Sequence, residues 1–140
     1  MNGTKFLHNV SNQKMKINNN LKIFFGIRKF DQIKSFNLLN GGKNNQVIKV
    51  NFKNNEFIIV KNYFNSKEDN HQRLKNEWTF LKYAHKLNLN CVPIPIEKNI
   101  TLNMASYSFI KGDKIISNSF LDEDIIKCAK FIVKINTRDV

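Results

Sequence analysis

The sequence predicts an α+β fold: a five-stranded antiparallel sheet packed against one long helix, with a further helix at the C-terminal end. Three observations carry this prediction. Three short segments with strand-like apolar patterns follow one another, separated by turns rich in Asn and Gly. A segment with apolar residues three and four positions apart comes next, and two more strand-like segments follow it. A second apolar pattern with helical spacing lies near the end of the chain.

The chain has 140 residues, which is enough for one domain with a modest core. Hydrophobic residues make up 41% and charged residues 24%, as in ordinary soluble globular proteins. Its two cysteines, Cys91 and Cys128, show no metal-binding spacing, so we expect reduced thiols in a cytoplasmic protein. No apolar run approaches the roughly 18 residues that cross a bilayer, so no membrane partner is expected.

The N-terminal part of the chain, residues 1–34, is expected to be a polar lead-in that ends in a short helix. Residues 1–20 are polar and rich in Asn, which predicts loose order. Residues 21–33 carry apolar side chains at a helical spacing that Gly26 interrupts. The predicted sheet and its helix follow in residues 35–112, and a linker with the last helix in residues 113–140. The predicted elements are strands at 35–39, 47–52 and 57–64, a helix at about 67–89, strands at 92–96 and 104–110, and a helix at about 122–136.

Lys61 is the first candidate functional residue. Both faces of its strand are apolar, so its ammonium group is expected in a covered place, where it requires an anionic partner. Glu77 faces the same requirement, because it lies between Leu74 and Leu81 on the inward stripe of the predicted helix. We therefore expect Lys61 and Glu77 to form an ion pair.

The Gly41-Gly42 turn is the second candidate feature. Because glycine has no Cβ atom, phosphate groups can approach the backbone N–H groups of such a turn. Taken singly, the features are weak: a GG turn is usually just a hairpin, and a lysine in a strand is usually solvated. In this order, a Gly turn, a strand lysine and a helix glutamate match the nucleotide-binding half of a kinase.

The segments LNGGKNNQVIKV, FIIVKNYF, RLKNEWTFLKYA, VPIPI and YSFIKG resemble the N-terminal lobe of the aminoglycoside phosphotransferase family. These kinase-like enzymes transfer phosphate to hydroxyl groups of small molecules. The resemblance covers about residues 35–137 and implies that the cofactor is ATP. It implies a phosphate loop, a lysine on the α- and β-phosphates, a glutamate that orients this lysine, and a hinge whose backbone groups pair with adenine. The phosphate loop would be Gly41, Gly42 and Asn44, and the hinge residues would be Ser108 and Ile110. The lysine on the phosphates would be Lys61, and the glutamate that orients it would be Glu77.

The catalytic half of such an enzyme is not recognised in this sequence. In the family, a second lobe supplies an H-x-D-x-x-x-x-N loop and a metal-binding Asp, but none of His8, His71 and His85 begins an H-x-D motif. No catalytic or metal-binding residue is therefore assigned. We expect a fragment that is inactive alone, with Mg²⁺ and the small-molecule hydroxyl acceptor bound only by a full-length protein.

The net charge of +12 supports a second hypothesis, a basic nucleic-acid-binding α+β module. Three of the 23 basic residues are Arg, the residue that usually binds phosphate and guanine. The others are lysines scattered along the chain, and A/T-rich codons would account for their abundance. This hypothesis does not account for Lys61 and Glu77 on apolar faces. A third possibility is an α+β domain without a ligand. The resemblance implies that residues 122–136 pack in a second lobe, so in this chain alone we expect their apolar surface to be exposed and to cause self-association through that helix.

Overall fold

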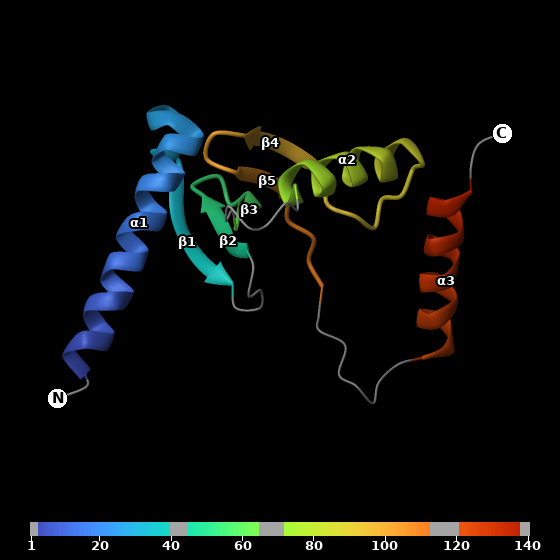
Figure 1. Ribbon diagram of the computed structural model, residues 1–140, viewed down its shortest axis with the longest axis horizontal. Helices are drawn as coiled ribbons and strands as arrows, with labels where there is room; N and C mark the ends of the chain where they lie inside the picture. The colour runs from blue at the N-terminus through green and yellow to red at the C-terminus, as the bar shows by residue number, and fades with distance from the viewer. Residues whose placement is uncertain (1–2, 40–44, 65–71, 113–120, 138–140) are drawn as a thin grey trace.

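The fold is α+β, with a five-stranded antiparallel sheet and three helices in the part of the chain that is described (Figure 1). The computed structural model describes residues 3–39, 45–64, 72–112 and 121–137. None of the helices in these ranges is long and apolar enough to cross a membrane. The elements are α1 (Gly3–Phe30), β1 (Ile33–Leu39), β2 (Asn45–Phe52), β3 (Phe57–Tyr63), α2 (Arg73–Lys86), β4 (Pro95–Asn99), β5 (Met104–Ser108) and α3 (Asp122–Asn136).

The strands lie in the order β1-β2-β3-β5-β4, and every neighbouring pair is antiparallel. The predicted meander of the first three strands is therefore confirmed. β3 is central, and its Lys61 lies opposite Val47 of β2 and Ala105 of β5. Because side chains alternate along a strand, Lys61 shares one face of β3 with Ile59 and Tyr63, while Ile58 and Val60 occupy the other.

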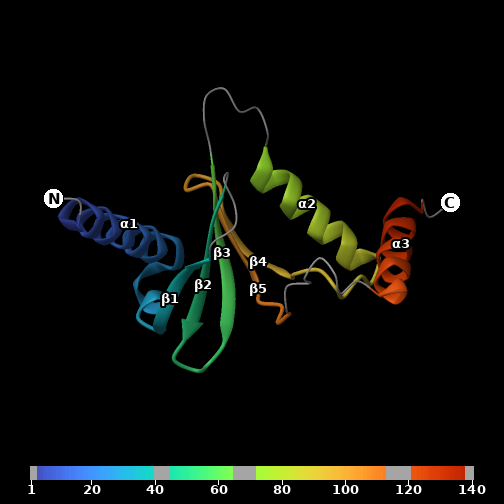
Figure 2. The same cartoon turned by 90° about the horizontal axis from the view of Figure 1, so that it is seen from below.

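Two helices, α1 and α2, cover opposite faces of the sheet (Figure 2). The prediction of one packed helix is wrong in this respect, because both sheet faces carry apolar side chains that require cover. On the α1 face, Ile17, Leu21, Phe24 and Phe25 pack against Ile48, Val50, Phe52, Ile58, Val60 and Met104. On the α2 face, Leu74 and Leu81 pack with Tyr63, Ala105 and Tyr107.

The expectation of a loosely ordered lead-in is wrong for residues 3–20, which belong to α1. Ile17, Leu21 and Phe24 follow a helical spacing, and all three are buried against the sheet. Gly26 adopts φ 70° and ψ 165°, a conformation that glycine reaches at little cost, and it produces the predicted interruption of the helix. The last turn is tied to β4 by an ion pair of 3.1 Å between Lys29 and Glu97.

Several further boundaries differ from the prediction, those of α2 and β4 by the most, and the strand predicted at 104–110 ends at Ser108. The helix predicted at 67–89 is described from Arg73 to Lys86, and residues 67–71 lie outside the described ranges. The strand predicted at 92–96 is Pro95–Asn99 instead. Proline has no N–H to donate to the ladder, so Pro93 lies before the strand and Pro95 is its first residue, a position at which proline is tolerated.

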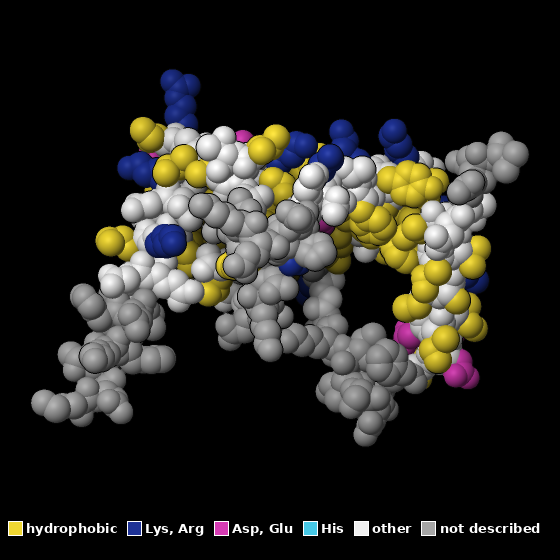
Figure 3. Space-filling model, viewed as in Figure 1, with side chains coloured by type: hydrophobic (Ala, Val, Ile, Leu, Met, Phe, Trp, Pro, Cys, Tyr) yellow, Lys and Arg dark blue, Asp and Glu magenta, His cyan; other side chains and the backbone are white. Residues whose placement is uncertain are grey.

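The C-terminal helix α3 has the predicted bounds, and most of its apolar residues are exposed as expected, while Phe131 and Ile135 are half-buried. Its first turn is capped by Asp124, whose side chain accepts a hydrogen bond of 3.2 Å from the N–H of Leu121. None of its residues is buried, and hydrophobic side chains are visible along it in Figure 3. A hydrogen bond of 3.3 Å from the hydroxyl of Tyr83 in α2 to the carbonyl of Ile135 joins the two helices.

Candidate functional site

Lys61 and Glu77 form the predicted ion pair, and this pair is the centre of the candidate site. Nζ of Lys61 lies 2.5 Å from Oε1 of Glu77. The pair is half-buried, with 26% of the lysine side chain and 30% of the glutamate side chain exposed. The lysine comes from the central strand β3, and the glutamate from the face of α2 that packs on the sheet between Leu74 and Leu81.

Two buried tyrosines complete the surroundings of Glu77. The hydroxyl of Tyr63 donates to Oε2 of Glu77 at 3.0 Å, and it lies 2.6 Å from the hydroxyl of Tyr107. Sequence reasoning assigned no role to either tyrosine. The signal that was present is the position of Tyr63, two residues after Lys61 on the same strand face.

Both tyrosine hydroxyls are held in the neutral form. Burial, the negative charge of Glu77 and the hydrogen bond that Tyr63 donates to Glu77 raise the pKa of Tyr63 far above its usual value. Burial and the charge of Glu77 raise the pKa of Tyr107 to about 12. At neutral pH each hydroxyl is therefore a hydrogen-bond donor, and Glu77 accepts one hydrogen bond from Lys61 and one from Tyr63.

Beyond α2, the face that carries Lys61 continues over β2 and β1. The strand register places Val47 beside Lys61, and Lys49 beside Ile59, on this face. Nζ of Lys49 lies 4.5 Å from the ring centroid of Phe57 and 3.9 Å from that of Phe109. Lys61 is thus followed along the sheet by an apolar strip, Val47 and Ile59, and then by a lysine held between two aromatic rings.

The residues assigned to a phosphate loop, Gly41, Gly42 and Asn44, lie outside the described residues. The strands that flank them are described. Asn45, the first residue of β2, pairs with Tyr63, and Val47 pairs with both Leu39 and Lys61. The end of β1 and the start of β2 therefore lie at the same end of the sheet as Lys61.

The two residues assigned to a hinge, Ser108 and Ile110, lie at and beyond the end of β5. The N–H of Ser108 donates to the carbonyl of Ile94 at 2.9 Å, and its hydroxyl accepts from the N–H of Ile94 at 2.8 Å. The N–H of Ser108 is therefore already paired within the sheet. The side chain of Ile110 is exposed, and its backbone makes no hydrogen bond to the described residues.

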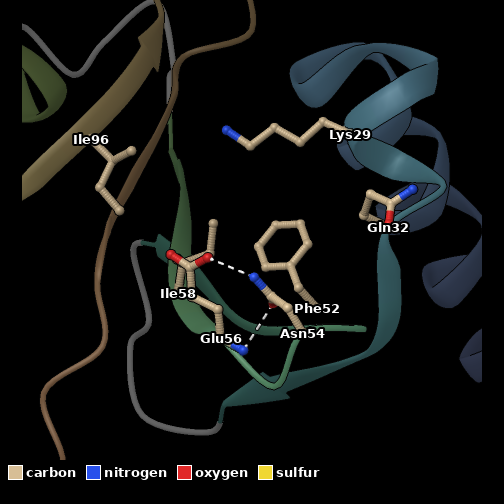
Figure 4. A pocket seen from close by; sticks show the side chains of 7 residues that line it. All are labelled: Lys29, Gln32, Phe52, Asn54, Glu56, Ile58 and Ile96. Atoms are coloured by element: carbon tan, nitrogen blue, oxygen red, sulfur yellow. Dashed lines mark hydrogen bonds between the residues drawn. The ribbon is translucent and has the colours of Figure 1, made fainter.

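A cavity of about 230 Å³ lies on the opposite sheet face, where α1 approaches the turn between β2 and β3 (Figure 4). Asn54 and Glu56 close the turn at its rim through hydrogen bonds of 3.0 and 3.3 Å. Ile58 lies in this cavity and Lys61 does not, because the two occupy different faces of β3. The cavity is therefore separate from the candidate site. Its lining residues are Lys29, Gln32, Phe52, Asn54, Glu56, Ile58 and Ile96.

Within the described ranges, no group of three or more His, Cys, Asp or Glu side chains is placed to hold a metal ion. In comparisons with known proteins, no family model matches the chain, and no curated protein matches it either.

Proposed function

We propose that this chain is the ATP-binding N-terminal lobe of an aminoglycoside-phosphotransferase-like kinase that acts in the cytoplasm on small molecules. The observation that carries the proposal is the half-buried ion pair between Lys61 and Glu77. A pair in this position requires desolvation of both charges, which seldom favours stability by itself. A lysine on the sheet, held by a glutamate from the packed helix, is the arrangement that positions nucleotide phosphates in kinases.

The ammonium group of Lys61 retains capacity for a ligand. It has three N–H donors, and Glu77 is its hydrogen-bond partner among the described residues. Because part of the side chain is exposed, phosphate oxygens can reach the remaining donors. Glu77 would fix the lysine, and the lysine would hold the α- and β-phosphates.

The apolar strip beside Lys61 supports the same proposal. Val47 and Ile59 are half-buried side chains between Lys61 and the ring pair of Phe57 and Phe109, and Ile59 also packs against the core on the α2 face. An apolar surface next to a cation suits a ligand with a flat base at one end and phosphates at the other. Next to Phe109, the backbone of Ile110 makes no hydrogen bond to the described residues, so its N–H and carbonyl groups are available to the edge of a base.

Binding and transfer are separate expectations for this chain. Phosphoryl transfer requires metal ions on the phosphates and a group that orients the attacking hydroxyl. The described residues bring no metal-binding cluster to Lys61, and no H-x-D motif occurs in the sequence. We therefore expect weak nucleotide binding and no transfer to a hydroxyl acceptor; Mg²⁺ and the acceptor would be bound by a second lobe.

Calorimetric titration with ATP, with and without Mg²⁺, tests the proposal. The wild-type chain should bind, and Lys61→Met should weaken binding at least about tenfold, since one charge-assisted contact contributes about 1.5–3 kcal/mol. Lys29→Met is the matched control, because it removes an ion-paired lysine from the opposite face. Equal affinities of wild type and Lys61→Met, or no binding at millimolar ATP, would refute it.

The net charge of +12 favours a second candidate function, nucleic-acid binding. Binding of this kind depends steeply on salt, because Lys–phosphate contacts release counterions. Tighter binding of RNA or DNA than of ATP, with a steep salt slope and no effect of Lys61→Met, would favour this candidate over the nucleotide site.

A further inference from the structure

We propose that Tyr63 and Tyr107 are positioning residues that hold the carboxylate of Glu77, so that its ion pair with Lys61 is formed before any ligand arrives. The identity of that ligand as a nucleotide rests on the proposed function. Its first test needs no nucleotide, so the two proposals can fail separately.

The direction of the hydrogen bonds follows from the chemistry of the groups. A tyrosine hydroxyl has one hydrogen to donate, and an ionised carboxylate can only accept. The Tyr63 hydroxyl donates its hydrogen to Oε2 of Glu77. Tyr107 must therefore be the donor in the contact of 2.6 Å between the two hydroxyls. The result is a series of hydrogen bonds in which Tyr107 donates to Tyr63 and Tyr63 donates to Glu77.

The hydrogen bonds to Glu77 fix its carboxylate through both carboxylate oxygens. Lys61 contacts Oε1 and Tyr63 contacts Oε2, so rotation of the carboxylate breaks one or both contacts. Two oxygens held by donors from one strand leave the group a single favourable orientation. The ammonium of Lys61 is held in turn, with Nζ also 5.7 Å from the ring centroid of Tyr107.

The tyrosines also oppose outward movement of α2. Tyr63 and Tyr107 are 3% and 1% exposed, so water has little access to their hydroxyls. If α2 moved away with Glu77, the buried hydroxyl of Tyr63 would lose its acceptor, and unsatisfied buried polar groups are costly. The ring of Tyr107 packs against Trp78 of α2 as well, at 6.1 Å between centroids. The arrangement therefore favours one position of α2, with the ion pair closed.

The test is the rate at which Lys61 is acetylated by acetic anhydride in the nucleotide-free chain, measured by peptide mass spectrometry. Lys82, on the exposed side of α2, serves as the internal reference. Tyr63→Phe removes only the hydroxyl and should speed acetylation of Lys61 about fivefold, the effect of losing one hydrogen bond. Tyr107→Phe should have a smaller effect, about twofold, because Tyr63 keeps its acceptor.

Two controls separate positioning from general destabilisation. Tyr83→Phe makes the same chemical change on α2, where the hydroxyl contacts Ile135 and not Glu77, and it should leave the rate unchanged. In a Glu77→Gln background, which already weakens the ion pair, Tyr63→Phe should add little, since both substitutions act on one contact. Far-UV circular dichroism checks that each variant folds.

The same variants are then titrated with ATP. Tyr63→Phe should weaken binding about fivefold, and Tyr83→Phe should not change it. If wild type binds no ATP but Tyr63→Phe still speeds acetylation, the nucleotide proposal fails and the positioning role stands. Equal acetylation of Lys61 in wild type and folded Tyr63→Phe, or full additivity with Glu77→Gln, would overturn the positioning role. If Tyr63→Phe does not fold, an unchanged rate in Tyr107→Phe overturns it.

Discussion

Nζ of Lys61 lies 2.5 Å from Oε1 of Glu77, although 16 residues separate them in the sequence. The contact joins the central strand to the helix above it, at a point where Leu74 and Leu81 bury the same helix face. The two leucines hold α2 against the sheet, and Glu77 lies between them on the same face of the helix. The ion pair is therefore a polar contact within an apolar interface.

Glu77→Gln should destabilise the protein by about 1–2 kcal/mol, because it leaves a half-buried ammonium without its counter-charge. Urea unfolding followed by circular dichroism measures the loss. Glu97→Gln is the matched control: it makes the same substitution in the ion pair with Lys29, whose side chains are 44% and 43% exposed. That control should cost at most about 0.5 kcal/mol. Equal losses for both variants would show that the Lys61–Glu77 pair contributes no more to stability than the exposed Lys29–Glu97 pair.

The ion pair could be predicted because each partner lies in a local pattern that excludes solvent. An apolar strand around Lys61 and an apolar helical stripe around Glu77 both require a partner of opposite charge, and nothing beyond local spacing is needed. The contact between Tyr63 and Tyr107 could not be found in this way. It depends on the pairing of β3 with β5, which local spacing does not reveal. Even in that register the two tyrosines are not direct partners, because Ile59 lies opposite Tyr107.

The helix α1 was missed over residues 3–20 for a different reason. Its residues up to Asn20 are mostly polar, so composition suggested loose order. Its stability comes from a few buried contacts of Ile17 and Leu21 with the sheet, and tertiary packing of this kind overrides local propensity. Gly26 marked the interruption correctly, because glycine readily adopts the positive φ found there.

Leu21→Ala should destabilise the protein by about 2–5 kcal/mol, since Leu21 is fully buried between α1 and the sheet. Ile23→Ala, two residues away on the same helix, should change stability by less than about 0.5 kcal/mol, because its side chain is 63% exposed. Thermal and urea unfolding of the two variants provide the comparison. If Leu21→Ala were as stable as Ile23→Ala, α1 would not belong to the core.

Stability should fall as the pH rises above about 10. Unfolded tyrosines lose their protons near that pH, but the pKa of folded Tyr107 is about 12 and that of Tyr63 is raised further. Between these values the unfolded state binds fewer protons than the folded state, so the free energy of unfolding decreases with pH. Each tyrosine contributes a slope of up to about 1.4 kcal/mol per pH unit, and below about pH 10 its contribution is fully present.

Urea unfolding at a series of pH values from about 8 to 11 measures this slope. Tyr63→Phe should make it shallower, because phenylalanine does not titrate. Tyr83→Phe removes a tyrosine from the exposed surface and should leave it unchanged. Parallel curves for wild type and Tyr63→Phe would show that the buried hydroxyl does not set the alkaline limit.

The chain should self-associate through α3. Four exposed aliphatic residues of this helix form two pairs that are seven positions apart, Ile125 with Ile132 and Ile126 with Val133. Residues seven positions apart lie on the same side of a helix, so the two pairs form an apolar seam two residues wide, and two copies of α3 can cover each other's apolar surface. Sedimentation equilibrium at about tens of micromolar protein should therefore show a mass above 16.4 kDa that increases with concentration.

Replacing Ile125 and Ile132 together by serine should return the chain to a monomer. The substitution removes apolar area from the seam and touches no buried residue, so the fold should persist by circular dichroism. The matched control replaces Ile23 and Ile27, two exposed isoleucines on α1, and should leave the association unchanged. If the control variant dissociates equally, general surface hydrophobicity and not α3 drives the assembly. If wild type is monomeric across the whole range, the four aliphatic residues of α3 do not suffice to bring two copies together.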